Sequence, residues 1–165
     1  MISFDTEGRR FDLRAVAVFI AGDHVLLHQM EGDEYWSLPG GRVELGEDAA
    51  TAVAREMREE LDVTVTVGPL LWVAENFFSI GARENHEVGF YFATEAPAGA
   101  SVLDIEARHF SDEKGRRLEF VWFQRQDLAG VDLRPAFMRE ALAQEPLRFA
   151  HVVNRHPSTD GRSSA

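Results

Sequence analysis

Runs of β-branched and aromatic residues predict strands in the first part of the chain. Phe11–Ile20 and His24–Met30 are two such runs, and the three residues between them have the chemistry of a tight turn. We therefore expect these two strands to form a hairpin. A short extended piece at 36–38 then leads into Pro39–Gly41, where glycine lets the backbone turn tightly and approach a ligand closely.

Further strand-forming runs follow in the second part of the chain. They are Val63–Val67, Leu70–Ile80, His86–Thr94 and Leu118–Gln124. The Gly68-Pro69 pair predicts a break between the first two runs, because proline cannot donate to a strand ladder. The stretch 96–114 shows no regular pattern and is expected to be irregular.

Two segments have helical patterns. Glu47–Leu61 contains no Gly or Pro, is rich in Ala and Glu, and carries acids at its start, where the helix dipole favours them. Pro135–Gln144 has proline in its first turn and apolar residues at helical spacing. Strands interspersed with helices predict an α/β fold in which helices cover a mixed sheet.

The length of 165 residues suits one domain. Residues from 154 onward are rich in Ser, Gly, Arg and Pro, so we expect a single domain over 1–150 and a mobile tail over 151–165. We predict a monomer or a homodimer.

Charge and composition narrow the function classes. Acidic residues number 28 against 17 Lys and Arg, a net charge of −11 that disfavours stable nucleic acid binding. The chain has no cysteine, which excludes disulfides and thiolate metal sites. No apolar run approaches the roughly 20 residues that cross a bilayer, and no secretory signal is present, so a cytoplasmic protein without a membrane partner is expected.

The predicted helix at 47–61 carries an unusual set of acids. At 100° per residue, Glu60 falls about 20° from Val53, inside the stripe that should face the core, and Glu56 and Glu59 lie on the same edge. An ionised carboxylate buried without a partner is costly, and like charges at this spacing repel. This arrangement indicates a divalent cation such as Mg²⁺ or Mn²⁺, which takes oxygen ligands.

The alternative is a solvated acidic face whose glutamates pair with Arg55 and Arg58. The inward angle of Glu60 and the Gly-Gly turn before the helix favour the metal site. The histidines show no close ligand spacing, so zinc is not indicated.

The same residues resemble the Nudix hydrolase signature. Gly41, five residues, Glu47, seven residues and then Arg55-Glu56-Met57-Arg58-Glu59-Glu60-Leu61-Asp62-Val63 match every specified position but one. The departure is Asp62, where the family has glycine. Glycine adopts the left-handed conformation freely after a helix, and Asp is among the few side chains that tolerate it, so we expect a small cost.

The resemblance implies a Nudix-type α/β/α sandwich and hydrolysis of a diphosphate linked to another moiety, usually a nucleoside. It implies Mg²⁺ or Mn²⁺ ligands at Glu56, Glu59, Glu60 and the carbonyl of Gly40. One glutamate would be the catalytic base, with no single one assigned. Arg55 would orient a catalytic glutamate, and Glu47 would brace Arg55.

Residues outside the signature are candidates for a further acid and for substrate binding. An additional carboxylate could come from Glu106, Glu113 or Glu87. Aromatic faces stack on bases and arginines bind phosphates, which makes the following residues substrate-binding candidates: Arg14, Trp36, Arg42, Phe77, Phe78, Arg83, His86 and Glu87.

Several functions stay open at this point. The substrate, a small nucleotide derivative, could be a nucleoside di- or triphosphate, a nucleotide sugar such as ADP-ribose, or a dinucleoside polyphosphate. A catalytically silent nucleotide-binding module is the alternative, although all box glutamates are present. Isoprenoid diphosphate isomerisation is disfavoured because the main enzymes of that type rely on a cysteine.

Overall fold

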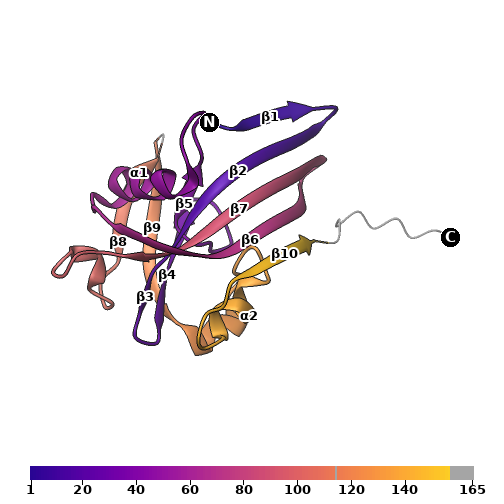
Figure 1. Ribbon diagram of the computed structural model, residues 1–165. Coiled ribbons are helices and arrows are strands. Elements are labelled where there is room, and N and C mark those ends of the chain that lie inside the picture. The colour runs from indigo at the N-terminus through magenta and orange to yellow at the C-terminus, as the bar shows by residue number, and fades with distance from the viewer. Residues whose placement is uncertain (114, 157–165) are drawn as a thin grey trace.

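The computed structural model describes residues 1–113 and 115–156, which form two β-sheets, two α-helices and two short 3₁₀ helices (Figure 1). The first sheet has six strands, in the order β1-β2-β7-β6-β10 with β5 paired to β2. Its strands are β1 (Ser3–Thr6), β2 (Arg9–Val18), β5 (Gly40–Arg42), β6 (Thr66–Ile80), β7 (Arg83–Glu95) and β10 (Ala150–Arg155). Because β2 and β7 run parallel while β6 and β7 run antiparallel, the sheet is mixed, as expected.

The second sheet has four strands in the order β3-β4-β9-β8. They are β3 (Ile20–Ala21), β4 (His24–Met30), β8 (His109–Glu113) and β9 (Arg116–Gln124). The hairpin predicted from Phe11–Ile20 and His24–Met30 is therefore wrong except at its tip, where Ile20 and Ala21 pair with Val25 and His24. The chain leaves the first sheet after Val18 and enters the second, a change that local turn chemistry does not reveal.

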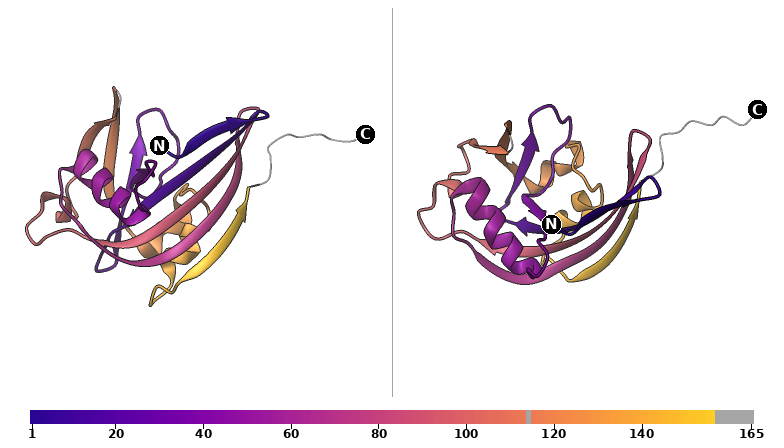
Figure 2. Two further views of the ribbon diagram at one scale, coloured as in Figure 1. Left: turned by 45° about the horizontal axis from the view of Figure 1, so that its top comes forward. Right: turned by 90° about the horizontal axis from the view of Figure 1, so that it is seen from above.

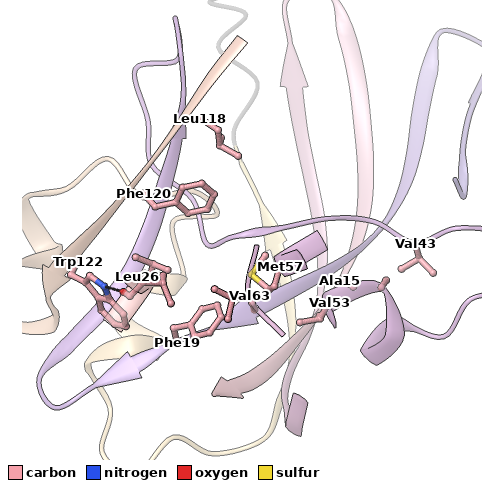
Figure 3. Close-up of a cluster of buried hydrophobic side chains, with 13 residues drawn as sticks. Ala15, Phe19, Leu26, Val43, Val53, Met57, Val63, Leu118, Phe120 and Trp122 are labelled. Atoms are coloured by element: carbon pink, nitrogen blue, oxygen red, sulfur yellow. Dashed lines mark hydrogen bonds between the residues drawn. The ribbon is translucent and has the colours of Figure 1, made fainter. Parts of the chain in front are cut away.

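Two helices cover opposite faces of the mixed sheet. α1 (Ala49–Leu61) packs Val53 and Met57 against Ala15 of β2, within the cluster drawn in Figure 3. α2 (Met138–Ala143) contributes Met138 to a second cluster, which includes Val16, the next residue of β2, on the other face. Successive strand residues point to opposite faces, so one strand contributes to both cores. Figure 2 shows α1 and α2 on the two sides of the curved sheet.

The start and end of α1 have clear side-chain and backbone causes. Asp48 is the N-cap and accepts a hydrogen bond from the Thr51 amide at 2.9 Å, so the helix begins two residues after the predicted Glu47. Asp62 ends the helix in the left-handed conformation with φ 53°, and its amide donates to the carbonyl of Arg58. The backbone conformation that glycine would adopt freely is thus taken by Asp62.

Other sequence predictions need correction. β1 precedes the first predicted strand, and β8 lies within the stretch expected to be irregular. Gly68-Pro69 does not separate two strands, because β6 runs through it with register shifts between Val67 and Trp72. The second helix is shorter than 135–144, and 3₁₀ turns form at Ser101–Leu103 and Arg125–Gly130.

The expected tail from residue 151 is also wrong in its first part. Residues 151–155 belong to β10, which pairs parallel to β6 from Ala150↔Trp72 to Arg155↔Phe77. The remainder of the predicted tail, 157–165, lies outside the described residues. Within the part of the chain that is described, neither helix has the length and apolarity needed to span a membrane.

Candidate active site

The Gly-Gly turn forms the edge of a cleft. Gly40 and Gly41 lie in β5, which pairs antiparallel with β2 so that Gly40 is opposite Val16 and Arg42 is opposite Arg14. The adjoining cleft has a volume of about 280 Å³. Among the sequence-predicted site residues, it is lined by Arg14, Gly40, Gly41, Arg42, Glu56, Glu60 and Glu113.

Glu60 is the acid that burial affects most. Its Oε2 atom is buried and has no hydrogen-bond partner. Burial, together with the negative charges of Glu56 and Glu113, raises the pKa of Glu60 to about 8 against the opposing charge of Arg14. Burial likewise raises the pKa of Glu56. The inward orientation predicted for Glu60 is thus present in the structure.

Gly41 leaves room for the Glu56 carboxylate. A Cβ atom at position 41 would overlap all three atoms of that carboxyl group. Gly40 is constrained differently, because its φ is 147° and a Cβ there would overlap the carbonyl oxygen of Ala15. The two glycines therefore let β5 approach both a side chain of α1 and the neighbouring strand β2.

Arg55 ties the helix to the preceding loop. Its Nε and Nη2 atoms donate to the two oxygens of Glu47 at 2.9 and 3.0 Å, and Nη2 also donates to the Arg42 carbonyl at 3.0 Å. Nη1 donates to Glu56 at 2.7 Å. The hydrogen bonds to Arg55 hold the pKa of Glu47 below its usual value, and those same bonds raise the pKa of Arg55. These contacts connect α1 to the loop before it, and the bracing role of the pair stays a prediction.

Glu59 lies at the outer side of this group. Its side chain is 59% exposed and its carboxylate is 3.3 Å from Nη1 of Arg55. It does not line the cleft, whereas Glu56 and Glu60 do. The expectation that Glu59 is a ligand stays a prediction.

Arg14 and His28 also line the cleft. Nη2 of Arg14 donates to the Gly40 carbonyl at 2.8 Å. His28 is 8% exposed, and its Nδ1 atom is buried without a hydrogen-bond partner. Burial and the nearby charge of Arg14 lower the pKa of His28 to about 3, so this imidazole is neutral at physiological pH.

A polar pair lies beside Arg14 on the same face of the sheet. Asn76 is 1% exposed and donates to Oε1 of Glu87 at 3.1 Å, and Oε2 of Glu87 is 3.8 Å from Nε of Arg14. His86 is the neighbour of Glu87 in β7 and points to the opposite face, where it stacks on Phe77 with 4.3 Å between ring centroids. The structure therefore does not bring His86 or Phe77 to the cleft.

The remaining candidates lie apart from the acids. Trp36 packs edge-on against Phe123 with 4.8 Å between centroids. Phe78 is half-buried beyond Asn76 on β6, and Arg83 begins β7 at an exposed turn. Glu106 is exposed after the first 3₁₀ turn and does not line the cleft, in contrast to Glu113 at the end of β8.

Comparison with known proteins places this arrangement in a family. The family model described as NUDIX domain matches residues 12–144, which include α1, most of both sheets and all the residues that line the cleft except Met1. The chain belongs to the Nudix family.

Solved structures with the Nudix fold resemble this chain at low sequence identity. A MutT protein from Bacillus halodurans superimposes with a TM-score of 0.60 at 17% identity, covering 88% of this chain and 90% of that one. A MutT NUDIX hydrolase from Burkholderia pseudomallei gives 0.57 at 24% identity, with 82% and 98% covered. An ADP-ribose pyrophosphatase from Streptococcus suis gives 0.56 at 17% identity, with 87% and 98% covered. At these identities the likeness shows the fold alone.

The cleft of this Nudix chain offers oxygen atoms as ligands for a divalent metal ion. The described residues contain no preformed group of three or more acidic or histidine side chains that could hold a metal ion. They do place two carboxylates, those of Glu56 and Glu60, in one cleft with Gly40. The buried Oε2 atom of Glu60 accepts no hydrogen bond. Mg²⁺ is usually held by one or two carboxylates and keeps several waters. The donor set therefore fits Mg²⁺ or Mn²⁺.

Several residues of the cleft were not predicted from the sequence. His28, Asp33, Tyr35 and Ser37 line the cleft, and Asn76 is buried behind it. An asparagine within an apolar strand is a usable signal, because buried amides need partners. His28 and Ser37 gave no comparable signal, since their pairing through the backbone depends on how strand β4 meets the segment before Gly40.

Proposed function

We propose that the chain hydrolyses a diphosphate linkage in a nucleoside diphosphate derivative with the help of Mg²⁺ or Mn²⁺. By family it is a Nudix pyrophosphohydrolase, and the observation that carries the finer proposal is the unpartnered buried Oε2 of Glu60. That oxygen lies beside Glu56 and the Gly40 carbonyl, in a cleft that is open to a small molecule. A site that holds negative charge at this density suits a divalent cation and its phosphate ligands.

The acids of α1 would hold the metal and the attacking water. When bound, the cation supplies charge neutralisation at the diphosphate and acidifies a coordinated water. Glu56 and Glu60, with the carbonyl of Gly40, are the proposed ligands, and Glu59 is a third carboxylate within one helical turn. A glutamate with a raised pKa is suited to accept a proton from water near neutral pH, so Glu60 is also a candidate base.

Arg55 and Glu47 would keep this set in place. Arg55 donates to Glu56 at 2.7 Å and to both oxygens of Glu47, so it fixes the orientation of one proposed ligand relative to the loop. Charge-assisted bonds of this kind give geometric specificity as well as energy. We therefore propose a positioning role for Arg55.

Arginines on β2 and β5 would recognise the diphosphate. Arg14 and Arg42 both line the cleft, and guanidinium groups bind phosphate oxygens through two parallel hydrogen bonds. Trp36 and Phe78 lie farther from the acids and are candidates for contacts to the nucleoside. The solved relatives include proteins named MutT and an ADP-ribose pyrophosphatase, so both nucleoside triphosphates and nucleotide sugars belong in the test.

Product release from a substrate panel tests the proposal. The panel holds nucleoside di- and triphosphates, ADP-ribose and dinucleoside polyphosphates, each with Mg²⁺, with Mn²⁺ and with chelator. We expect one class to turn over only with metal. If no class turns over while a nucleotide still raises the melting temperature, the chain is the silent binding module instead.

The pH dependence of stability gives a second prediction. The pKa of Glu60 is raised from 4.5 to about 8, so its contribution to stability is full below pH 4.5 and is lost as pH rises to 8. We expect the melting temperature of metal-free protein to fall between pH 6.5 and 8, where Glu60 loses its proton and His28 no longer titrates, with an effect of roughly 2 kcal/mol from Glu60. His28 acts in the opposite direction. Its pKa is lowered from 6.5 to about 3, so its effect is that the stability of the folded protein rises as the pH increases from about 3 to 6.5.

Thermal unfolding of wild type and Glu60→Gln across this pH range isolates the Glu60 contribution. The variant should show a flatter decline, and Mg²⁺ should stabilise wild type more at pH 8 than at pH 5. Identical pH profiles for the two proteins would contradict the prediction.

A further inference from the structure

The guanidinium of Arg14 joins two parts of the cleft. Nη2 donates to the carbonyl of Gly40 at 2.8 Å, and Nε is 3.8 Å from Oε2 of Glu87 on β7. The Gly40 carbonyl is one of the proposed metal ligands. The side chain is 31% exposed, so it borders the open cleft and is not fixed within the core.

The charges around Arg14 are those that a divalent cation would neutralise. Burial opposes the charged guanidinium, but the negative charges of Glu87, Glu60 and Glu56 outweigh burial and leave the pKa of Arg14 above its usual value. The guanidinium thus takes part of its electrostatic stabilisation, after that from Glu87, from Glu60 and Glu56, the two carboxylates of α1 that line the cleft. A dication placed at those carboxylates would repel it.

Glu87 offers the guanidinium a second position. Asn76 donates to Oε1 of Glu87 at 3.1 Å and holds that carboxylate from the side away from Arg14. Oε2 faces Arg14 at 3.8 Å, which is at the long end of an ion pair and leaves room for a closer contact. A short movement away from Gly40 would shorten this pair.

We propose that Arg14 and the divalent cation compete for the Gly40 carbonyl and the field of Glu56 and Glu60. Cation binding moves the guanidinium off Gly40 toward Glu87, along the wall of the cleft. Arg14 is therefore a positioning residue whose place depends on the metal. The inference rests on the proposed function, because it assumes that the divalent cation binds at Glu60.

The test is the affinity of metal-free protein for Mn²⁺ alone, measured from the electron paramagnetic resonance signal of free Mn²⁺. Titrations are run at pH 9, above the pKa of about 8 for Glu60, to limit competition by protons. Removing the competing cation in Arg14→Met should tighten Mn²⁺ binding about tenfold. Arg14→Gln, which keeps an amide donor for Gly40, is the second variant in case methionine disturbs folding.

Arg42→Met is the matched control. Arg42 is opposite Arg14 in the β2–β5 register and lines the same cleft, but its guanidinium is paired with Asp12 at 2.8 Å. Its removal changes the net charge equally and should tighten Mn²⁺ binding by about threefold at most. If Arg14 variants bind Mn²⁺ no more tightly than Arg42→Met, the competition is disproved.

A double-mutant cycle with Glu87→Gln tests the second position. In wild type, Glu87→Gln should weaken Mn²⁺ binding, because the Arg14 guanidinium loses the carboxylate toward which it moves. In the Arg14→Met background the loss of affinity should be smaller, because no guanidinium is present to move. Equal losses in both backgrounds would overturn the proposed movement. If wild type binds Mn²⁺ and Glu60→Gln abolishes the binding, the metal site stands, and a negative result with the Arg14 variants contradicts only the proposed competition. If neither wild type nor any variant binds Mn²⁺, the proposed metal site is contradicted as well.

Discussion

Glu60→Gln should lower metal-dependent turnover by about a thousandfold or more, while the fold is retained. The substitution keeps the shape of the side chain and removes one charge from the cleft, where the Glu60 Oε2 atom is buried without a donor. Loss of a metal ligand removes charge stabilisation, and loss of a base typically costs a further factor of 10² to 10⁴. The measurement is kcat/KM with Mg²⁺ for the substrate found in the panel.

The controls separate chemistry from stability. Glu140→Gln removes an equal charge from an exposed position on α2 and should leave kcat/KM unchanged. Circular dichroism and thermal unfolding should show that Glu60→Gln folds, and at pH 8 without metal it should be at least as stable as wild type, because a raised pKa marks an unfavourable buried charge. Retained turnover in a folded Glu60→Gln protein would contradict the proposed role of this residue.

Gly41→Ala should reduce turnover by about a hundredfold with little loss of stability. The added Cβ would overlap the carboxylate of Glu56, which is the movable end of a side chain, so we expect that carboxylate to rotate away from the cleft. Displacing a reacting group by about 1 Å can cost a factor of 10². The measurements are kcat/KM and the affinity for Mn²⁺, both of which should fall.

Substitutions at two other glycines serve as controls for Gly41→Ala, and a second substitution at Glu56 tests its cause. Gly130→Ala meets no atom within 4 Å and should leave activity unchanged, whereas Gly40→Ala would press against the Ala15 carbonyl at φ 147° and should destabilise the fold by several kcal/mol. Glu56→Asp shortens the displaced side chain, so the double variant with Gly41→Ala should recover part of the Mn²⁺ affinity. Full activity in Gly41→Ala would show that the position of Glu56 is not critical.

The geometry of α1 could be predicted because a helix is a local structure. Its period of 3.6 residues relates Glu56, Glu59 and Glu60 to Val53 without reference to the rest of the chain. The capping residue Asp48 and the left-handed Asp62 are local in the same sense. Burial of Glu60 followed from its angle alone, and the structure places its Oε2 atom in the interior.

The strands were less predictable because the residues of a strand do not indicate which other strand it pairs with. The run from Phe11 to Ile20 has one continuous pattern, yet its last residues pair in a different sheet from the first. β8 and β10 have weak local signals; β8 is held by antiparallel pairing to β9, the next strand along the chain, whereas β10 is held by parallel pairing to β6, which only the overall topology brings beside it. Tertiary pairing overrides local propensity in such segments.

The sequence by itself determined the acidic helix, its inward glutamate and the glycine turn, all within about 24 consecutive residues that resemble a known signature. Only the tertiary structure decided what surrounds them. Arg14 reaches Gly40 from 26 positions away, and Asn76 and Glu87 meet across a hairpin because of its register. These contacts depend on which strands become neighbours and which face each residue takes, and a shift of one residue would reverse every face.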